Sequence, residues 1–180
     1  MSVEDDRILR LVFQACGTTS VLSHLTTVAA RAEGLSGLAK LNGEARDRVR
    51  MAALLHDIGK TPLYRKTDFH PIDSANAAVS MGRGDLCELI AHHTGARFEV
   101  QLRGITIPWP WRGGDEADIL MLADLTTSVN GRALSLSERR LEITIRLGPD
   151  SLQARALESV WPLTATAAAR LDPKGEIILI

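Results

Sequence analysis

Cysteine is scarce in this sequence. Two cysteines, Cys16 and Cys87, lie far apart and lack the CxxC spacing of a zinc or redox motif. Small secreted domains depend on many cysteines for their disulfides. We therefore expect two reduced thiols packed inside a cytoplasmic protein, rather than a disulfide or a ligand pair. The acidic stretch 1–6 lacks the basic region of a signal peptide and agrees with that location.

Long apolar runs and an excess of one charge are also missing. No apolar stretch approaches the roughly 18 residues of a membrane span, so we expect no membrane association. The net charge of −1 gives no argument for binding nucleic acid or an anionic surface. A length of 180 residues is compatible with one domain over 1–180 that buries its own core.

Helical periodicity dominates what is present. Apolar residues recur at three- and four-residue spacing, whereas only Glu176–Ile180 looks β-like, which we expect to be a tail. Ser135 and Glu138 have the spacing of a capping box, Pro71 suits a first helical position, and Asp150 suits an N-cap. The predicted class is all-α, with helices near 8–13, 21–32, 44–57, 71–81, 85–93, 115–129, 136–147, 150–160 and 163–171.

The segment 94–114 differs from the rest. Arginines and the tryptophans Trp109 and Trp111 stand among glycines and prolines. We predict a long irregular connection, and such loops often act as lids or binding loops. The two tryptophans could equally pack over an edge of the core.

The stretch 52–60 is the centre of the sequence. A run of small and apolar residues ends in His56 and Asp57, followed by Gly59 and Lys60. A buried carboxylate without a partner costs several kcal/mol, so such a group is normally paired or bound to a metal. Gly59 suits the left-handed position that ends many helices. Lys60 then emerges beside the pair, where it could meet an anion.

Histidines and two embedded acids supply further ligand types. Asp57 and Asp124 interrupt apolar helical runs, and the five histidines are His24, His56, His70, His92 and His93. Nitrogen and carboxylate donors without thiolate favour Mn, Fe, Mg, Co or Ni over a closed structural zinc site. Taken singly, His24 could be a packed residue, His70 a turn residue and His93 a helix cap. Asp124 could be a satisfied buried polar group.

Taken together, the pattern resembles the HD-domain superfamily, whose signature is a histidine, a His-Asp pair and a distant aspartate on helices. Here these are His24, His56-Asp57 and Asp124. The residues at 52–60, His70-Pro71, 90–93 and 122–124 agree with that signature. The resemblance covers about residues 20–145, which would form the core, with a helical extension over about 150–180.

The resemblance implies an all-helical bundle and a metal-dependent phosphohydrolase. The first divalent ion would be held by His24, His56, Asp57 and Asp124. A second ion would take His70 and one of His92 and His93, with Asp57 bridging.

The closest likeness is to the HD-type diadenosine tetraphosphate hydrolases and, more loosely, to HD-GYP phosphodiesterases. The Gly-Tyr-Pro extension is absent, and Ser20 stands where a third metal would need an acid. We therefore do not expect a cyclic-di-GMP phosphodiesterase.

The expected reaction is hydrolysis of a phosphomonoester or phosphoanhydride, with a nucleotide as the first candidate, by metal-activated water. The expected catalytic residues are His56, Asp57 and Lys60, although Lys60 could be merely solvated. Two alternatives remain: an HD-fold di-iron oxygenase and a non-catalytic sensing domain. A complete ligand set argues against the second alternative.

The expected partner is a small phosphate-containing molecule, with homodimer formation left open. Trp109 or Trp111 could stack on a base. Besides Lys60, the candidates to bind outer phosphates are Arg97, Arg103, Arg112 and Arg132.

Overall fold

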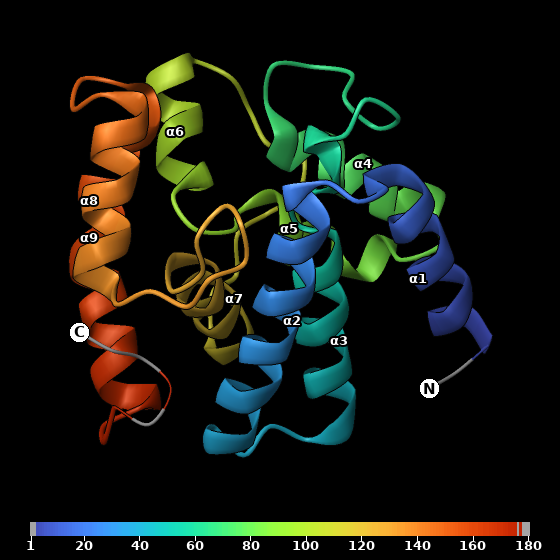
Figure 1. Cartoon of the computed structure of the whole chain (residues 1–180), viewed down its shortest axis with the longest axis horizontal. Helices are drawn as coiled ribbons and strands as arrows, with labels where there is room; N and C mark the ends of the chain where they lie inside the picture. Colours follow the sequence, from blue (N-terminus) through green and yellow to red (C-terminus); the bar gives the residue numbers. More distant parts are fainter. Residues whose placement is uncertain (1–2, 176, 178–180) are drawn as a thin grey trace.

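Helices make up every regular element of residues 3–175 and 177, the part of the chain that the computed structural model describes (Figure 1). Within this part there is no strand, and one isolated antiparallel bridge joins Thr127 to Ala133. The all-α prediction is confirmed. The elements are α1 (Val3–Cys16), α2 (Ser20–Leu38), α3 (Gly43–Leu55), η1 (Ile58–Lys60), α4 (His70–Ser80), η2 (Gly84–Leu86), α5 (Cys87–Ala91), α6 (Ala96–Arg103), α7 (Asp115–Leu125), α8 (Leu136–Leu147) and α9 (Leu152–Leu171).

Three helices, α2, α3 and α7, pack on one another at the centre of the molecule (Figure 1). Every residue of α7 from Ile119 to Leu125 is buried. A helix that is apolar on all sides belongs in the interior, which explains why α7 is enclosed. Helices α6 and α8 pack on α9 on one side of this centre, and α4 packs on α5 and η1 on the other.

Local capping sets several helix starts. The capping box of α8 forms as predicted, because Ser135 accepts a hydrogen bond from the Glu138 N–H and Glu138 accepts one from the Ser135 N–H. Pro71 lies in the first turn of α4, also as predicted. The N-cap of α9 is Ser151 rather than Asp150, since the Ser151 hydroxyl accepts from the Ala154 N–H.

Two predictions about regular structure were wrong. Part of the connection expected to be irregular over 94–114 is helix α6, whose Ala96 and Val100 are buried. The two helices expected over 150–171 are one continuous helix, α9, with Pro162 inside it. Proline removes one backbone hydrogen bond, but residues on both sides of it are buried, including Val160 and Thr164. Packing on both sides of the proline keeps the helix continuous.

Several helix ends also differ from the prediction. Helix α2 continues through Gly34 to Leu38, because Leu35 and Ser36 are buried and extend its packed face. Helix α3 ends at Leu55, α5 covers only Cys87–Ala91, and α7 ends at Leu125. The β-like tail predicted over Glu176–Ile180 lies outside the described residues, apart from Ile177.

Both cysteines are free and buried, as predicted. Burial, together with the charge of Asp57, raises the pKa of Cys16 to about 11. Burial, together with Asp85, raises the pKa of Cys87 to about 11. Both thiols therefore stay protonated and serve as small packed groups.

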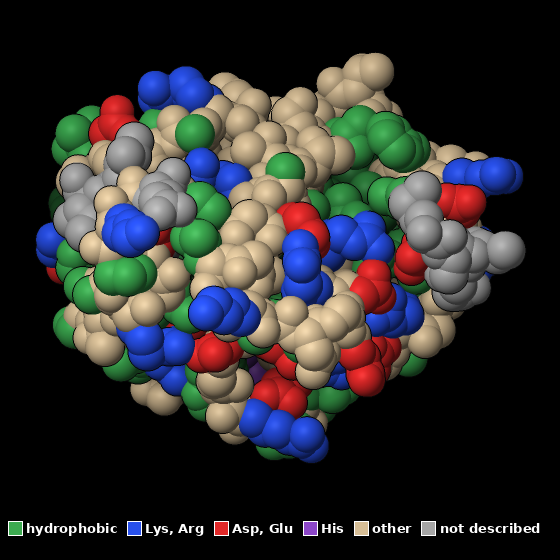
Figure 2. Space-filling model, turned by 90° about the horizontal axis from the view of Figure 1, so that it is seen from below, with side chains coloured by type: hydrophobic (Ala, Val, Ile, Leu, Met, Phe, Trp, Pro, Cys, Tyr) green, Lys and Arg blue, Asp and Glu red, His purple; other side chains and the backbone are tan. Residues whose placement is uncertain are grey.

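The outer surface carries charges of both signs. Lysine and arginine side chains alternate with aspartate and glutamate over the face in Figure 2, in keeping with the near-zero net charge. Among the described residues, no helix combines the length and apolar character that crossing a membrane requires.

Candidate metal centre and substrate pocket

The end of α3 places His56 and Asp57 at the centre of the bundle. His56 is the C-cap residue and is completely buried, and its Nδ1 donates to the Ala53 carbonyl oxygen over 2.8 Å. Because a carbonyl can only accept, this bond fixes the proton on Nδ1 and directs Nε2 to the interior. His56 Nε2 is buried and has no hydrogen-bond partner. An unpartnered buried nitrogen is costly, so it suits a metal ligand.

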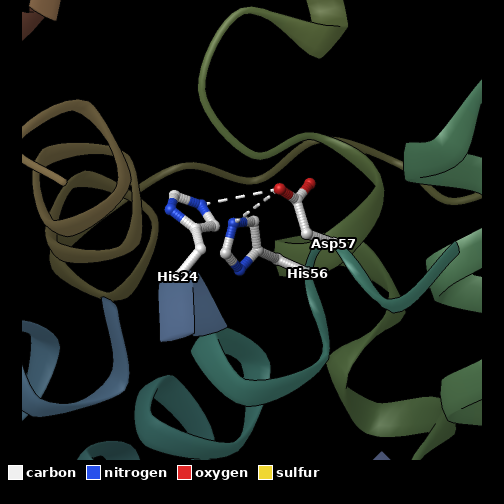
Figure 3. A group of neighbouring side chains, drawn as sticks. All are labelled: His24, His56 and Asp57. Atoms are coloured by element: carbon white, nitrogen blue, oxygen red, sulfur yellow. Dashed lines mark ion pairs between the residues drawn. The ribbon is translucent and has the colours of Figure 1, made fainter. Parts of the chain in front are cut away.

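His24 and Asp124 complete a first cluster around this nitrogen. His24 Nε2, from α2, lies 3.2 Å from Asp124 Oδ1 and 3.5 Å from Asp57 Oδ2. His56 Nε2 lies 3.7 Å from each of the same two oxygens. Figure 3 shows the His24 and His56 rings both directed at the Asp57 carboxylate. The His24 ring is held by its Nδ1, which donates to the Ser128 carbonyl over 2.9 Å.

The other oxygen of Asp57 faces a second pair of histidines. Asp57 Oδ1 lies 3.0 Å from His70 Nε2 and 3.7 Å from His93 Nε2, and it is buried without a hydrogen bond. His93 Nδ1 donates to the Ile90 carbonyl over 2.6 Å, which directs Nε2 to the carboxylate. Asp57 thus lies between two groups of candidate ligands, as a bridging carboxylate would.

Buried His/Asp groups here could hold a divalent metal ion. Three sets have ligand atoms within 4.8 Å of one another: His24–His56–Asp57, His56–His93–Asp124 and Asp57–His70–His93. The donors are imidazole nitrogen and carboxylate oxygen, without thiolate, so the set fits Mn, Fe, Mg, Co or Ni.

The charges of this cluster favour a cation. Burial alone would lower the pKa of His56, but Asp57 and Asp124 outweigh it and raise that pKa. Burial alone would raise the pKa of Asp57, yet Lys60, His56 and His70 hold it well below its usual range. The pKa of Asp124 is also well below its usual range, because His24 and His56 outweigh burial. Both carboxylates are therefore charged at neutral pH, and the space between them attracts positive charge.

The second pair of histidines stays neutral. Burial, reinforced by His56, lowers the pKa of His93 to about 3. Burial and the neighbouring Lys60 lower the pKa of His70. Metal ligation requires neutral imidazole, so both rings are in the ligating form at neutral pH.

Lys60 and Thr94 contact the two carboxylates from the solvent side. Lys60 Nζ lies 2.5 Å from Asp57 Oδ2, and its side chain is 45% exposed. The Thr94 hydroxyl donates to Asp124 Oδ2. Thr94 has a φ of 52°, and a left-handed β-branched residue stores roughly 1–3 kcal/mol of strain. Strain at a residue that holds an acid of the cluster points to a positioning role.

We expect Thr94→Val to weaken Mn²⁺ binding about tenfold, since Asp124 loses a donor while shape and backbone strain are kept. Thr94→Ser keeps the hydroxyl and should bind Mn²⁺ within about twofold of the wild type. Calorimetric titration of both metal-depleted variants with Mn²⁺ tests this. Equal losses in the two variants would contradict a role for the hydroxyl.

An open pocket of about 250 Å³ reaches the cluster from outside. One end is formed by Asp57, Lys60, His70, His93, Thr94 and Asp124, and the remaining walls by Pro71, Gly95, Ala96, Glu99, Arg139, Ile143, Arg146, Leu147, Gln153, Ala156 and Leu157. The pocket therefore combines candidate metal ligands, cations and an apolar wall.

Two arginines of α8 stand in this pocket. Arg139 is 6% exposed, its Nη2 lies 3.8 Å from Asp124 Oδ1, and its buried Nε has no partner. Glu142 joins the two arginines, since it accepts from Arg139 Nη1 and, over 2.8 Å, from Arg146 Nε. A guanidinium beside candidate metal ligands and lining a pocket is suited to binding phosphate oxygens.

Some residues singled out in the sequence lie elsewhere. His92 accompanies His93 in the chain but turns away from the cluster, and its Nε2 donates to the Trp109 carbonyl over 2.7 Å. Arg97 stacks on Trp111, with 4.6 Å between the guanidinium carbon and the ring centroid. Trp109 packs against the main core. These two tryptophans and Arg97 do not line the pocket.

The other predicted phosphate-binding arginines are also outside it. Arg103 pairs with Glu99, and Arg112 lies 3.3 Å from Glu88. Arg132 does not line the pocket, and its backbone N–H donates to the Ser128 hydroxyl. Of the predicted substrate-binding residues, only Lys60 lines the pocket.

Sequence reasoning missed Arg139, Arg146, Glu99 and Gln153. A signal for Arg139 was present, because it follows buried Leu136 by three residues and precedes buried Ile143 by four. A charged residue on the buried face of a helix is unusual and marks a position where a partner is needed.

The family comparison agrees with this geometry. A sequence model described as HD domain matches residues 21–127, more than half of the chain. All six residues of the two clusters fall within the match. No curated protein and no solved structure matches the chain.

Proposed function

Since the chain belongs to the HD-domain family, we propose that it is a metal-dependent phosphohydrolase acting on a phosphomonoester or phosphoanhydride, with nucleotides as the first candidates. The observation that carries the proposal is the pocket itself. It brings candidate metal ligands together with Lys60, Arg139 and Arg146. Phosphate needs cations around it, and a hydrolase needs a route for substrate to the metal.

We propose that His24, His56, Asp57 and Asp124 hold one ion, and that His70 and His93 hold a second with Asp57 as the bridge. Such ions lower the pKa of bound water and neutralise phosphate oxygens. The protein's own part is to fix these ligands. The carbonyls of Ala53, Ser128 and Ile90 orient three of the rings by accepting from their Nδ1 atoms.

The cations of the pocket would bind the substrate's phosphate. Lys60 contacts Asp57 but is half exposed, so its ammonium can also donate to a phosphoryl oxygen. Arg139 lies beside Asp124 and lines the pocket, so its guanidinium can contribute positive charge next to a bound phosphate. Arg146 is nearer to solvent and would neutralise charge at the pocket entrance.

Variants of the neighbouring residues His92 and His93 test the proposed metal site and activity. Metal-depleted protein is reloaded with Mn²⁺ or Fe²⁺, and bound metal and phosphate release from nucleoside mono-, di- and dinucleoside polyphosphates are measured. We expect His93→Gln to weaken metal binding and lower phosphate release by about 100-fold. His92→Gln can still donate to the Trp109 carbonyl and should keep the metal content of the wild type.

The proposal fails if the loaded wild-type protein releases no phosphate from any of these compounds. Oxygen consumption without phosphate release would point to a di-iron oxygenase instead. Equal metal contents in the His93 and wild-type proteins would remove His93 from the ligand set.

A further inference from the structure

One buried carboxylate of the pocket belongs to neither metal cluster. Glu99 lies on α6, one turn beyond Ala96, and is 7% exposed. It lines the same pocket as Asp57 and Asp124. Buried glutamates are rare unless they are paired, so the partners of this one decide what it can do.

The hydrogen bonds that the Glu99 side chain accepts from described residues all end on one carboxylate oxygen, Oε1. Oε1 accepts from Arg103 Nε over 2.7 Å and from Gln153 Nε2 over 3.0 Å, and Arg103 Nη2 lies 2.6 Å away. Oε2 accepts no hydrogen bond from the described residues. The side chain is thus fixed by Arg103 and Gln153 while one oxygen is left to accept a donor in the pocket.

The charge around Glu99 indicates which kind of substrate group would donate a hydrogen bond to it. Arg103 already neutralises the carboxylate, so the site has little excess charge for an ammonium group. A neutral hydroxyl is the better partner, because it gains a charge-assisted hydrogen bond without adding a charge. A carboxylate oxygen has no proton to donate to a phosphate oxygen, whereas Lys60, Arg139 and Arg146 supply hydrogen-bond donors for phosphate elsewhere in the pocket.

The size of the pocket also favours a small hydroxylated substrate. Its volume of about 250 Å³ is below the roughly 300–1,000 Å³ of most small-molecule sites. Such a volume suits a single phosphorylated alcohol better than two nucleosides joined by a phosphate chain. The apolar wall of Ile143, Leu147 and Leu157 can pack against the carbon skeleton of that alcohol.

We propose that Glu99 determines specificity by accepting a hydrogen bond from a hydroxyl of the substrate, so that the substrate is the monophosphate of a polyhydroxylated alcohol such as a sugar or nucleoside. Arg103 and Gln153 act as positioning residues for Glu99. The inference rests on the proposed function, because it assumes that the metal end of the pocket holds the phosphate.

Equilibrium binding tests the inference without requiring turnover. The affinities of adenosine 5′-monophosphate, ribose 5-phosphate and phenyl phosphate are measured by calorimetry on Mn²⁺-loaded protein. The wild type should prefer the two hydroxylated ligands over phenyl phosphate, which has the same phosphate and no hydroxyl. We expect Glu99→Ala to reduce that preference at least tenfold, and the isosteric Glu99→Gln to reduce it less. Exposed Glu158→Gln is the control and should keep the wild-type preference.

The inference is overturned if the wild type shows no preference for the hydroxylated ligands, or if the Glu99 variants weaken all three ligands equally. An equal loss would mean that Glu99 only supports the shape of the pocket. If the protein binds the hydroxylated ligands selectively through Glu99 but releases no phosphate, the inference stands and the hydrolase proposal fails.

Discussion

Replacing Asp57 with asparagine is expected to abolish phosphate release, with a loss of about 1,000-fold or more, equivalent to about 4 kcal/mol of transition-state stabilisation. Each oxygen of Asp57 faces a different group of histidines, at 3.5 and 3.7 Å on one side and at 3.0 and 3.7 Å on the other. An amide carries no charge and presents an NH₂ group in place of one oxygen. It therefore cannot bridge two cations.

Metal binding gives a readout that is independent of the substrate. A ligand that binds only the folded state raises the melting temperature, so added Mn²⁺ should raise that of the wild type. It should have little effect on Asp57→Asn, whose circular dichroism should remain helical. The control is Asp68→Asn, because the Asp68 carboxylate is 95% exposed and pairs only loosely with Arg65 at 3.7 Å. Turnover near the wild-type level in Asp57→Asn would remove this residue from the reaction.

The candidate metal ligands could be predicted because their chemistry is visible in the sequence. His56 and Asp57 interrupt an apolar run, and a buried polar pair requires partners wherever the helix ends. The sequence did not distinguish His92 from His93. Which ring turns inward depends on the end of α5, where the His93 Nδ1 bonds the Ile90 carbonyl.

The substrate-binding arginines could not be predicted in the same way. Arg97 and Arg103 were assigned to an irregular loop, but they lie on α6, where local partners take up both side chains. Whether an arginine faces a pocket depends on tertiary packing rather than on composition. Arg139 was detectable only by combining its charge with its helical position.

The sequence singles out Gly59 as a position that suits glycine, but the structure gives a different physical reason for it. The sequence suggested a left-handed residue ending a helix, but Gly59 is in the 3₁₀ turn η1 without a positive φ. Glycine is required here because the first turn of α4 approaches too closely. A Cβ would lie 2.6 Å from the His70 carbonyl oxygen, 2.6 Å from the Ser74 nitrogen and 2.8 Å from the Asp73 Cβ.

Gly59→Ala is therefore expected to lower the free energy of unfolding by about 3 kcal/mol, near the upper end for overpacking, because two of the three contacts are backbone atoms. Relief of the clash must move the start of α4, which carries His70, or break the bond from the Gly59 N–H to the Ser74 hydroxyl, 2.9 Å long. Metal affinity should fall together with stability, because a shift of α4 would move His70 away from Asp57.

Urea denaturation with and without Mn²⁺ measures both effects. Gly37→Ala is the matched control: Gly37 is an exposed helical glycine of α2 with nothing within 4 Å of an added Cβ. Alanine there should stabilise the protein by roughly 0.5–1 kcal/mol, because glycine is the poorer helix former. If both alanine variants were equally stable, the contact between η1 and α4 would tolerate a methyl group. The closeness of these two elements would then not explain why glycine follows the His-Asp pair.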